Sequence, residues 1–247
     1  MSYLRRYLFT GVLLVAGMSS IGSVFRCRAV LAAQGSQSPS LDFGGGETLK
    51  LKLLWPSGVS LGEAVFVSAP TEKNKLRFEL TVEADLPGHD IVESYTSLAA
   101  RDTLCSLQFQ KKGKEGARTS EETLEFDQSA HQVSKTSGGK TTVLPAPGCA
   151  RDPLTFFYYF RKQLAAGNPV NQATFYPAPG YGLDLKPSGV QTISAGGRQR
   201  RAEKYLVTYS GPNSSKTFEL WVSAEARREP LLVRLPFPLA IFSAELQ

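Results

Sequence analysis

Residues 76–84 read LRFELTVEA, a stretch in which apolar and polar side chains alternate at every position. Successive side chains of a strand point to opposite faces, so the apolar residues of this stretch would share one face. Residues 49–54 (LKLKLL) repeat the pattern with leucines and lysines. Both segments therefore predict strands that bury one face and expose the other to solvent.

Similar short segments follow along the chain, separated by turn residues such as Gly138-Gly139. Residues 92–100 fit either a strand or a helical turn. Many short strands with one helix are typical of a strongly curved antiparallel sheet or a barrel-like domain, so the fold class is predicted as mainly β. The further predicted strands are residues 63–68, 104–111, 119–126, 132–136, 141–144, 174–176, 189–194, 200–210, 217–223, 231–235 and 241–246.

One segment breaks the strand period and predicts a short helix rich in aromatic residues. Asp152 is a suitable N-cap, Pro153 suits the first helical position, and Gly167 suits the end. We expect this helix to cover an open end of the sheet or to sit in its concavity. The residues at helical spacing include Leu154, Phe157, Tyr158 and Arg161.

The aromatic run at residues 156–160 has two interpretations. It could line an apolar cavity, with tyrosine hydroxyls and Arg161 orienting a ligand, or it could simply fill the concave face of the sheet. Arg161 could likewise meet a ligand carboxylate or phosphate, or pair with an acidic residue of a neighbouring strand and fix the helix. Core filling and ion pairing are the favoured interpretations. If a ligand binds, the candidate residues are Phe157, Tyr158, Arg161 and Trp221.

Residues 1–33 have the layout of an export signal. Arg5-Arg6 precedes an apolar run at residues 7–15, and Ala32 and Ala33 offer a small-residue cleavage zone. The run is too short and too interrupted by Gly and Ser to be a good spanning helix. An ordinary secretory signal is the favoured interpretation, and the arginine pair also fits the twin-arginine export pattern as the alternative. We expect export, and membrane contact only through an uncleaved signal.

After the signal, residues 34–46 are predicted to form a flexible linker and residues 47–247 a single domain. The chain has 28 Lys and Arg against 22 Asp and Glu, but four of the arginines lie in the signal. The remaining 24 basic residues against 22 acidic ones leave a net charge of only +2. This balance gives no electrostatic reason to expect a nucleic-acid partner.

Two cysteines, Cys105 and Cys149, remain once the signal is removed. In an exported chain such a pair predicts one disulfide, with two unpaired thiols as the alternative. The sequence has no CxxC pair, nucleophile elbow or phosphate-binding loop. Asp85, His89 and Asp90 could hold a metal, but a solvated turn is the simpler interpretation. No catalytic residue, metal site or cofactor is therefore assigned.

Residues 152–161 read DPLTFFYYFR, and residues 220–230 read LWVSAEARREP. The first resembles the Asp-x-Leu-Ser…Tyr-x-x-Arg helix, and the second the Trp-x-Ser-x-Asp-x-Arg-x-x-Pro hairpin, of the domain of unknown function 3108 family. Thr155 and Glu225 depart from the pattern. The resemblance covers roughly residues 47–247. It implies an antiparallel β architecture in the bacterial envelope and brings no known reaction, cofactor or catalytic residue.

Together these features predict an exported bacterial protein of the periplasm or cell envelope. We expect a non-catalytic binding or scaffold domain whose partner is an apolar or lipid-like ligand or an envelope protein. A metal-dependent or hydrolytic periplasmic enzyme is the alternative.

Overall fold

The structure is a computed structural model of the 247-residue chain. It describes residues 41–72, 74–86, 89–168, 170, 172–174, 182–211, 214–237 and 240–247. The predicted signal and residues 34–40 of the predicted linker lie outside these ranges. Within them, no helix is both long enough and apolar enough to cross a membrane.

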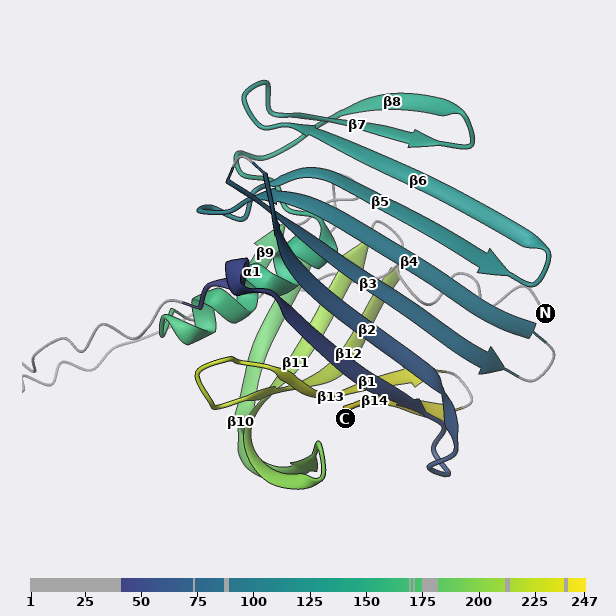
Figure 1. Cartoon of the computed structure of the whole chain (residues 1–247), viewed down its shortest axis with the longest axis vertical. Helices are drawn as coiled ribbons and strands as arrows, with labels where there is room; N and C mark the ends of the chain where they lie inside the picture. The colour runs from purple at the N-terminus through teal and green to yellow at the C-terminus, as the bar shows by residue number, and fades with distance from the viewer. Residues whose placement is uncertain are drawn as a thin grey trace, which may run out of the picture.

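One antiparallel sheet of 14 strands forms the body of the protein (Figure 1). The first eight strands zigzag in chain order, and the last six do the same after the helix. The halves join where β14 pairs with β1, so β8 and β9 lie at the edges of an open sheet. The strands are β1 Glu47–Leu54, β2 Ser60–Thr71, β3 Lys75–Leu86, β4 His89–Ala100, β5 Ser106–Glu115, β6 Arg118–Asp127, β7 Gln132–Ser137, β8 Lys140–Pro145, β9 Gln172–Thr174, β10 Gly182–Ala195, β11 Arg198–Gly211, β12 Ser214–Ser223, β13 Pro230–Phe237 and β14 Ala240–Leu246.

The prediction of a mainly β domain with one aromatic-rich helix is confirmed. Residues 92–100, which fitted either a strand or a helical turn, belong to β4 because they pair with β3 on one side and β5 on the other. Strand β10 begins at Gly182, earlier than predicted, and its register shifts between Pro187 and Val190. This irregularity interrupts the alternation by which strands are recognised in a sequence.

Helix α1, Pro153–Ala165, lies between the two halves of the sheet (Figure 1). Leu154 and Tyr158 belong to a core formed with the first half. Phe156 and Phe160 belong to a second core formed with β10–β12. The sheet therefore curves around the helix, and the face that carries these two cores is called here the inner face.

The last residues of the predicted linker pack against the domain. Phe43 begins a short 3₁₀ helix (η2, Phe43–Gly45) that Asp42 caps through the Gly44 amide. The Phe43 ring is buried and meets the Tyr158 ring edge-on, with centroids 4.8 Å apart. This apolar contact fixes residues that the glycine-rich composition suggested would be free.

Candidate functional site

Arg161 of α1 is a fully buried charged residue. Its Nη1 and Nη2 donate to the two carboxylate oxygens of Glu47 in β1, at 2.6 and 2.9 Å. Its Nε and Nη2 also donate to the backbone carbonyls of Arg228 and Arg227, both at 2.9 Å. Arg161 thus has the ion-pairing role favoured from the sequence, and it ties α1 to β1 and to the β12–β13 turn.

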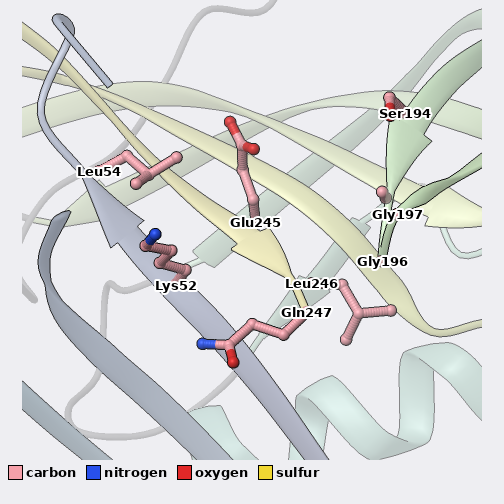
Figure 2. A pocket seen from close by; sticks show the side chains of 9 residues that line it. Lys52, Leu54, Ser194, Gly196, Gly197, Glu245, Leu246 and Gln247 are labelled. Atoms are coloured by element: carbon pink, nitrogen blue, oxygen red, sulfur yellow. The ribbon is translucent and has the colours of Figure 1, made fainter. Parts of the chain in front are cut away.

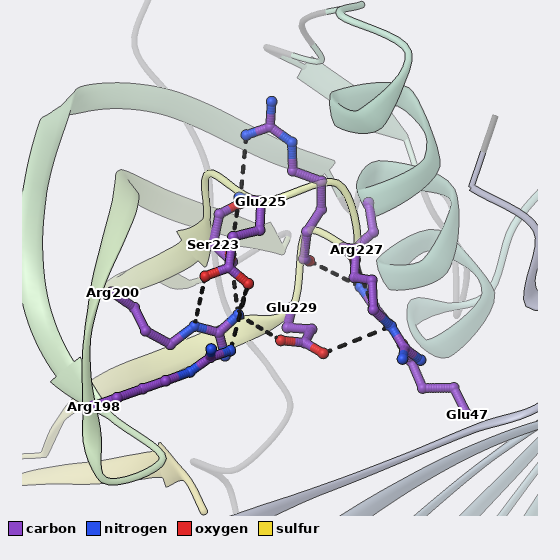
Figure 3. A network of polar contacts seen from close by, with 9 residues as sticks. Glu47, Arg198, Arg200, Ser223, Glu225, Arg227 and Glu229 are labelled. Carbon is purple, nitrogen blue, oxygen red and sulfur yellow. Dashed lines mark hydrogen bonds and ion pairs between the residues drawn. The ribbon is translucent and has the colours of Figure 1, made fainter. Parts of the chain in front are cut away.

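The β12–β13 turn carries a wider network of ion pairs (Figure 3). Arg200 donates to Glu225 and Glu229, each at 2.6 Å, and to the Ser223 hydroxyl at 3.2 Å. The Nη2 of the exposed Arg227 lies 3.1 Å from a carboxylate oxygen of Glu47. The two sequence blocks that carry the family resemblance therefore meet here, because Arg161 of the first block donates to the backbone carbonyls of Arg227 and Arg228 in the second.

Tyr158 and Phe157 differ in how deeply they lie. Tyr158 is fully buried and stacks on Phe78, with ring centroids 4.0 Å apart. Burial raises the pKa of its hydroxyl above the usual range, and that hydroxyl has no hydrogen-bond partner among the described residues. Phe157 is only half-buried, and its ring centroid lies 5.0 Å from that of Phe66 in β2. Tyr158 is therefore a core residue, whereas Phe157 lies at the border of the area that the helix covers.

Trp221 lies on the other face of the sheet from these helix residues. Its neighbour Leu220 packs in the core that includes α1, while Trp221 packs in a separate core with Ala202 and Leu232. Lys204 extends over its ring, with Nζ 4.7 Å from the ring centroid. The structure thus brings together three of the four candidate ligand-binding residues and separates Trp221 from them.

Asp152 does more than the N-cap role predicted for it. Its buried carboxylate accepts hydrogen bonds from the Leu154 amide and from both the amide and the hydroxyl of Thr155. It also accepts hydrogen bonds from the hydroxyls of Ser97 in β4 and Ser106 in β5, at 2.7 and 2.6 Å. Burial raises the pKa of this carboxyl, and the side-chain donors oppose that rise. Nothing in the sequence marks Ser97 and Ser106 for this role, because other polar residues such as Glu93 and Lys111 occur along the same strands.

Replacing Asp152 with alanine is expected to lower the free energy of unfolding by about 3 kcal/mol, because it leaves several buried donors without an acceptor. A surface N-cap contributes only ~1 kcal/mol. Asp127→Ala is the matched control, since Asp127 also accepts from two backbone amides but is exposed. Urea unfolding of both variants measures the difference, and equal losses would contradict the proposed role of the buried serine contacts.

Cys105 and Cys149 form a disulfide, which confirms the predicted pair. Their Cα atoms lie 4.7 Å apart. The Ser106 amide donates to the Ala150 carbonyl at 3.0 Å beside the bridge, and the Gln128 side chain contacts the backbone of both residues. The bridge and Asp152 therefore fix the start of the helix to the start of β5.

Charged residues line the inner face on β4–β7. In the strand register, Lys111 of β5 lies opposite Tyr95 of β4 and Glu122 of β6. These side chains therefore share the face that carries the buried Tyr95 ring. The Lys111 Nζ lies 3.2 Å from a carboxylate oxygen of Glu93, and the Lys135 Nζ lies 2.7 Å from one of Glu122. All four charged side chains keep partial access to solvent. This part of the inner face is therefore polar.

Apolar residues line the inner face on β1–β3 and β12–β13. Leu53, Phe66 and Val82 come from the first half, and Phe218 and Leu235 from the second. Along their strands these five residues alternate with residues of the opposite face of the sheet. All five are only half-buried, although they lie on the face that carries the cores. The helix thus covers only part of the inner face, and the remainder is apolar on one side and charged on the other.

Two further places in the molecule bear on a ligand or metal site. Figure 2 shows a pocket of about 220 Å³ between the β10–β11 turn and the end of β14, lined in part by Lys52, Gly196 and Glu245. The four candidate ligand-binding residues are not among its lining. His89 begins β4, but its side chain is outside the described part. Elsewhere in the described ranges no three His, Cys, Asp or Glu side chains gather as a metal site.

Comparison with known proteins supports the fold and the family. The chain is similar to the crystal structure of a beta-barrel-like protein of domain of unknown function DUF1849 from Brucella abortus, with a TM-score of 0.56 and 10% identity. That match covers 81% of this chain and 94% of the other. No curated protein matches the sequence. A family model matches residues 48–247, and the chain therefore belongs to the family described as protein of unknown function (DUF3108).

Proposed function

We propose that this protein is an exported, non-catalytic binding protein of the bacterial envelope that holds an amphipathic, lipid-like molecule on its inner face. One observation carries the proposal: the inner face beyond the helix is apolar on β1–β3 and charged on β4–β7, and both sides are partly exposed. An amphipathic molecule has this same division. The disulfide supports export, because such bonds persist in oxidising compartments.

The helix residues have distinct parts in this proposal. Phe157 borders the uncovered surface through Phe66 and would contact the apolar part of the ligand. Tyr158 and Arg161 are fully buried and hold the helix against the sheet. The charged pair of Glu93 and Lys111 would meet the polar end of the ligand.

Native mass spectrometry of protein purified from its own envelope tests the proposal. We expect co-purifying lipid-like material in the unmodified protein and much less of it in a Val82→Asp variant, whose new charge lies on the inner face. Val92→Asp is the control, since Val92 lies on the outer face of the adjacent strand and is exposed. Circular dichroism checks that strand content is the same in both variants.

Two results would contradict the proposal. One is a protein that carries no such material and binds no fluorescent fatty-acid probe, which would favour a pure scaffold. The other is a stoichiometric transition metal that is lost on His89→Ala, which would favour the enzyme alternative.

A further inference from the structure

Two neighbouring hairpin tips lack charged residues, although Asp85 and Asp90 lie at the same end of the sheet on β3 and β4. Residues 53–62 (LLWPSGVSLG) span the β1–β2 turn with the strand ends beside it, and residues 235–244 (LPFPLAIFSA) span the β13–β14 turn in the same way. Neither stretch contains a charged residue, although charged residues make up 20% of the chain. The two tips are adjacent because Leu54 pairs with Ser243 in the sheet. Both lie at the end of the sheet away from α1, at the right in Figure 1.

Three of the described side chains of these tips are large, apolar and exposed, and Phe242 beside them is half-buried. Trp55 is 37% exposed, Val59 61% and Ile241 57%, which makes three of the six large apolar residues exposed in the described ranges. Trp55 meets Phe242 edge-on at 4.8 Å, and its amide donates to the Val59 carbonyl at 2.8 Å. The uncharged tip, defined as Trp55, Val59, Ile241 and Phe242, is therefore a fixed surface rather than a loose loop.

Charges begin together at the base of these tips. In the strand register, Lys52 of β1 lies opposite Glu63 of β2 on one side and Glu245 of β14 on the other. Arg234 of β13 lies opposite Ser243 of β14. From Lys52 to Leu54, where β1 ends, the strand rises about 7 Å, at ~3.3 Å per residue, and Trp55 follows beyond that point. Surface-bound segments bury their apolar side to a depth of about 5–10 Å in a bilayer, with charged residues left at the headgroups.

We propose that the uncharged tip binds the surface of a lipid bilayer. The uncharged stretch ends in a row of mixed charges, as insertion to the headgroup level requires, and Trp55 supplies the residue type that prefers this level. The tips also lie next to the uncovered inner face, because Leu53 and Leu235 belong to both. This contact is independent of the signal segment and stands whether or not the inner face holds a ligand.

Tryptophan fluorescence with vesicles of phosphatidylethanolamine and phosphatidylglycerol tests the proposal. The chain has two tryptophans, and Trp221 is only 2% exposed, so a response to vesicles reports on Trp55. We expect a blue shift in emission and quenching by brominated lipid in the unmodified protein, and neither in Trp55→Phe. Both signals depend on the tip even if the signal segment also binds the vesicles.

Charged substitutions then locate the contact. Val59→Asp and Ile241→Asp are expected to reduce quenching by brominated lipid roughly tenfold, because each places a charge in the inserted layer. Val143→Asp is the matched control, since Val143 on edge strand β8 is 57% exposed, as Ile241 is, and we expect it to leave quenching unchanged. Equal quenching in Ile241→Asp and Val143→Asp would overturn the proposal. So would an unquenched protein that self-associates and becomes monomeric on Ile241→Asp, which would identify a second copy as the occupant.

Discussion

Replacing Arg161 with methionine is expected to lower the free energy of unfolding by about 4 kcal/mol, one of the two largest effects of a single substitution in this protein. The substitution leaves the Glu47 carboxylate buried, with the exposed Arg227 as its one remaining charged partner among the described residues. It also removes a donor from the backbone carbonyls of Arg227 and Arg228. Urea unfolding followed by circular dichroism measures the change.

A double variant separates the unpaired charge from lost packing. Arg161→Met combined with Glu47→Leu should recover a large part of the loss, because a buried ion pair can be replaced by apolar residues at little cost. Arg77→Met is the control, since Arg77 and Glu79 form an ion pair with side chains 53% and 36% exposed. We expect it to change stability by less than ~1 kcal/mol. A small loss in Arg161→Met, similar to that control, would show that the helix is held mainly by its aromatic contacts.

Loss of the disulfide is expected to have an effect of similar size. Cys105 and Cys149 are 44 residues apart, and closing a loop of that length restricts the unfolded chain by about 4 kcal/mol in the chain-entropy model. Cys105→Ser or Cys149→Ser should therefore lower the melting temperature without changing the strand content. Reduction of the unmodified protein should give the same shift.

Peptide mapping without reductant checks the bond directly. We expect Cys105 and Cys149 in one linked species. Alkylation of both thiols in the native, unreduced protein is the outcome that would remove the basis for this prediction. A serine variant as stable as the unmodified protein would instead show that the hydrogen bonds around Asp152 suffice to hold the helix start.

The strands and the helix were predictable because their signals are local. Alternation at residues 76–84 and the Asp152-Pro153 pair need no knowledge of distant parts of the chain. The disulfide was predictable for a different reason, because only two cysteines lie outside the predicted signal. Residues 92–100 were ambiguous because their assignment depends on pairing with both β3 and β5.

The details of the site depend on contacts that no local pattern encodes. Glu47 follows a glycine-rich stretch and precedes Arg161 by 114 residues, so its burial depends on the folded sheet. The two faces of β12 differ because the curved sheet has a packed core on each side, which placed Trp221 away from α1. The packing of Phe43 could not be predicted, because one aromatic residue in a polar, glycine-rich segment carries no periodic signal.

The pairing of β1 with β14 has a consequence for how the chain reaches its folded state. Every other neighbouring pair of strands is consecutive in the chain, so each half can form by successive hairpins. The two halves join only through contacts such as Leu51 with Leu246, which are nearly the whole domain apart in sequence. Contacts this distant slow folding. A chain still emerging from a ribosome can therefore hold two separate half-sheets, but it cannot complete the sheet until residues 240–246 are free.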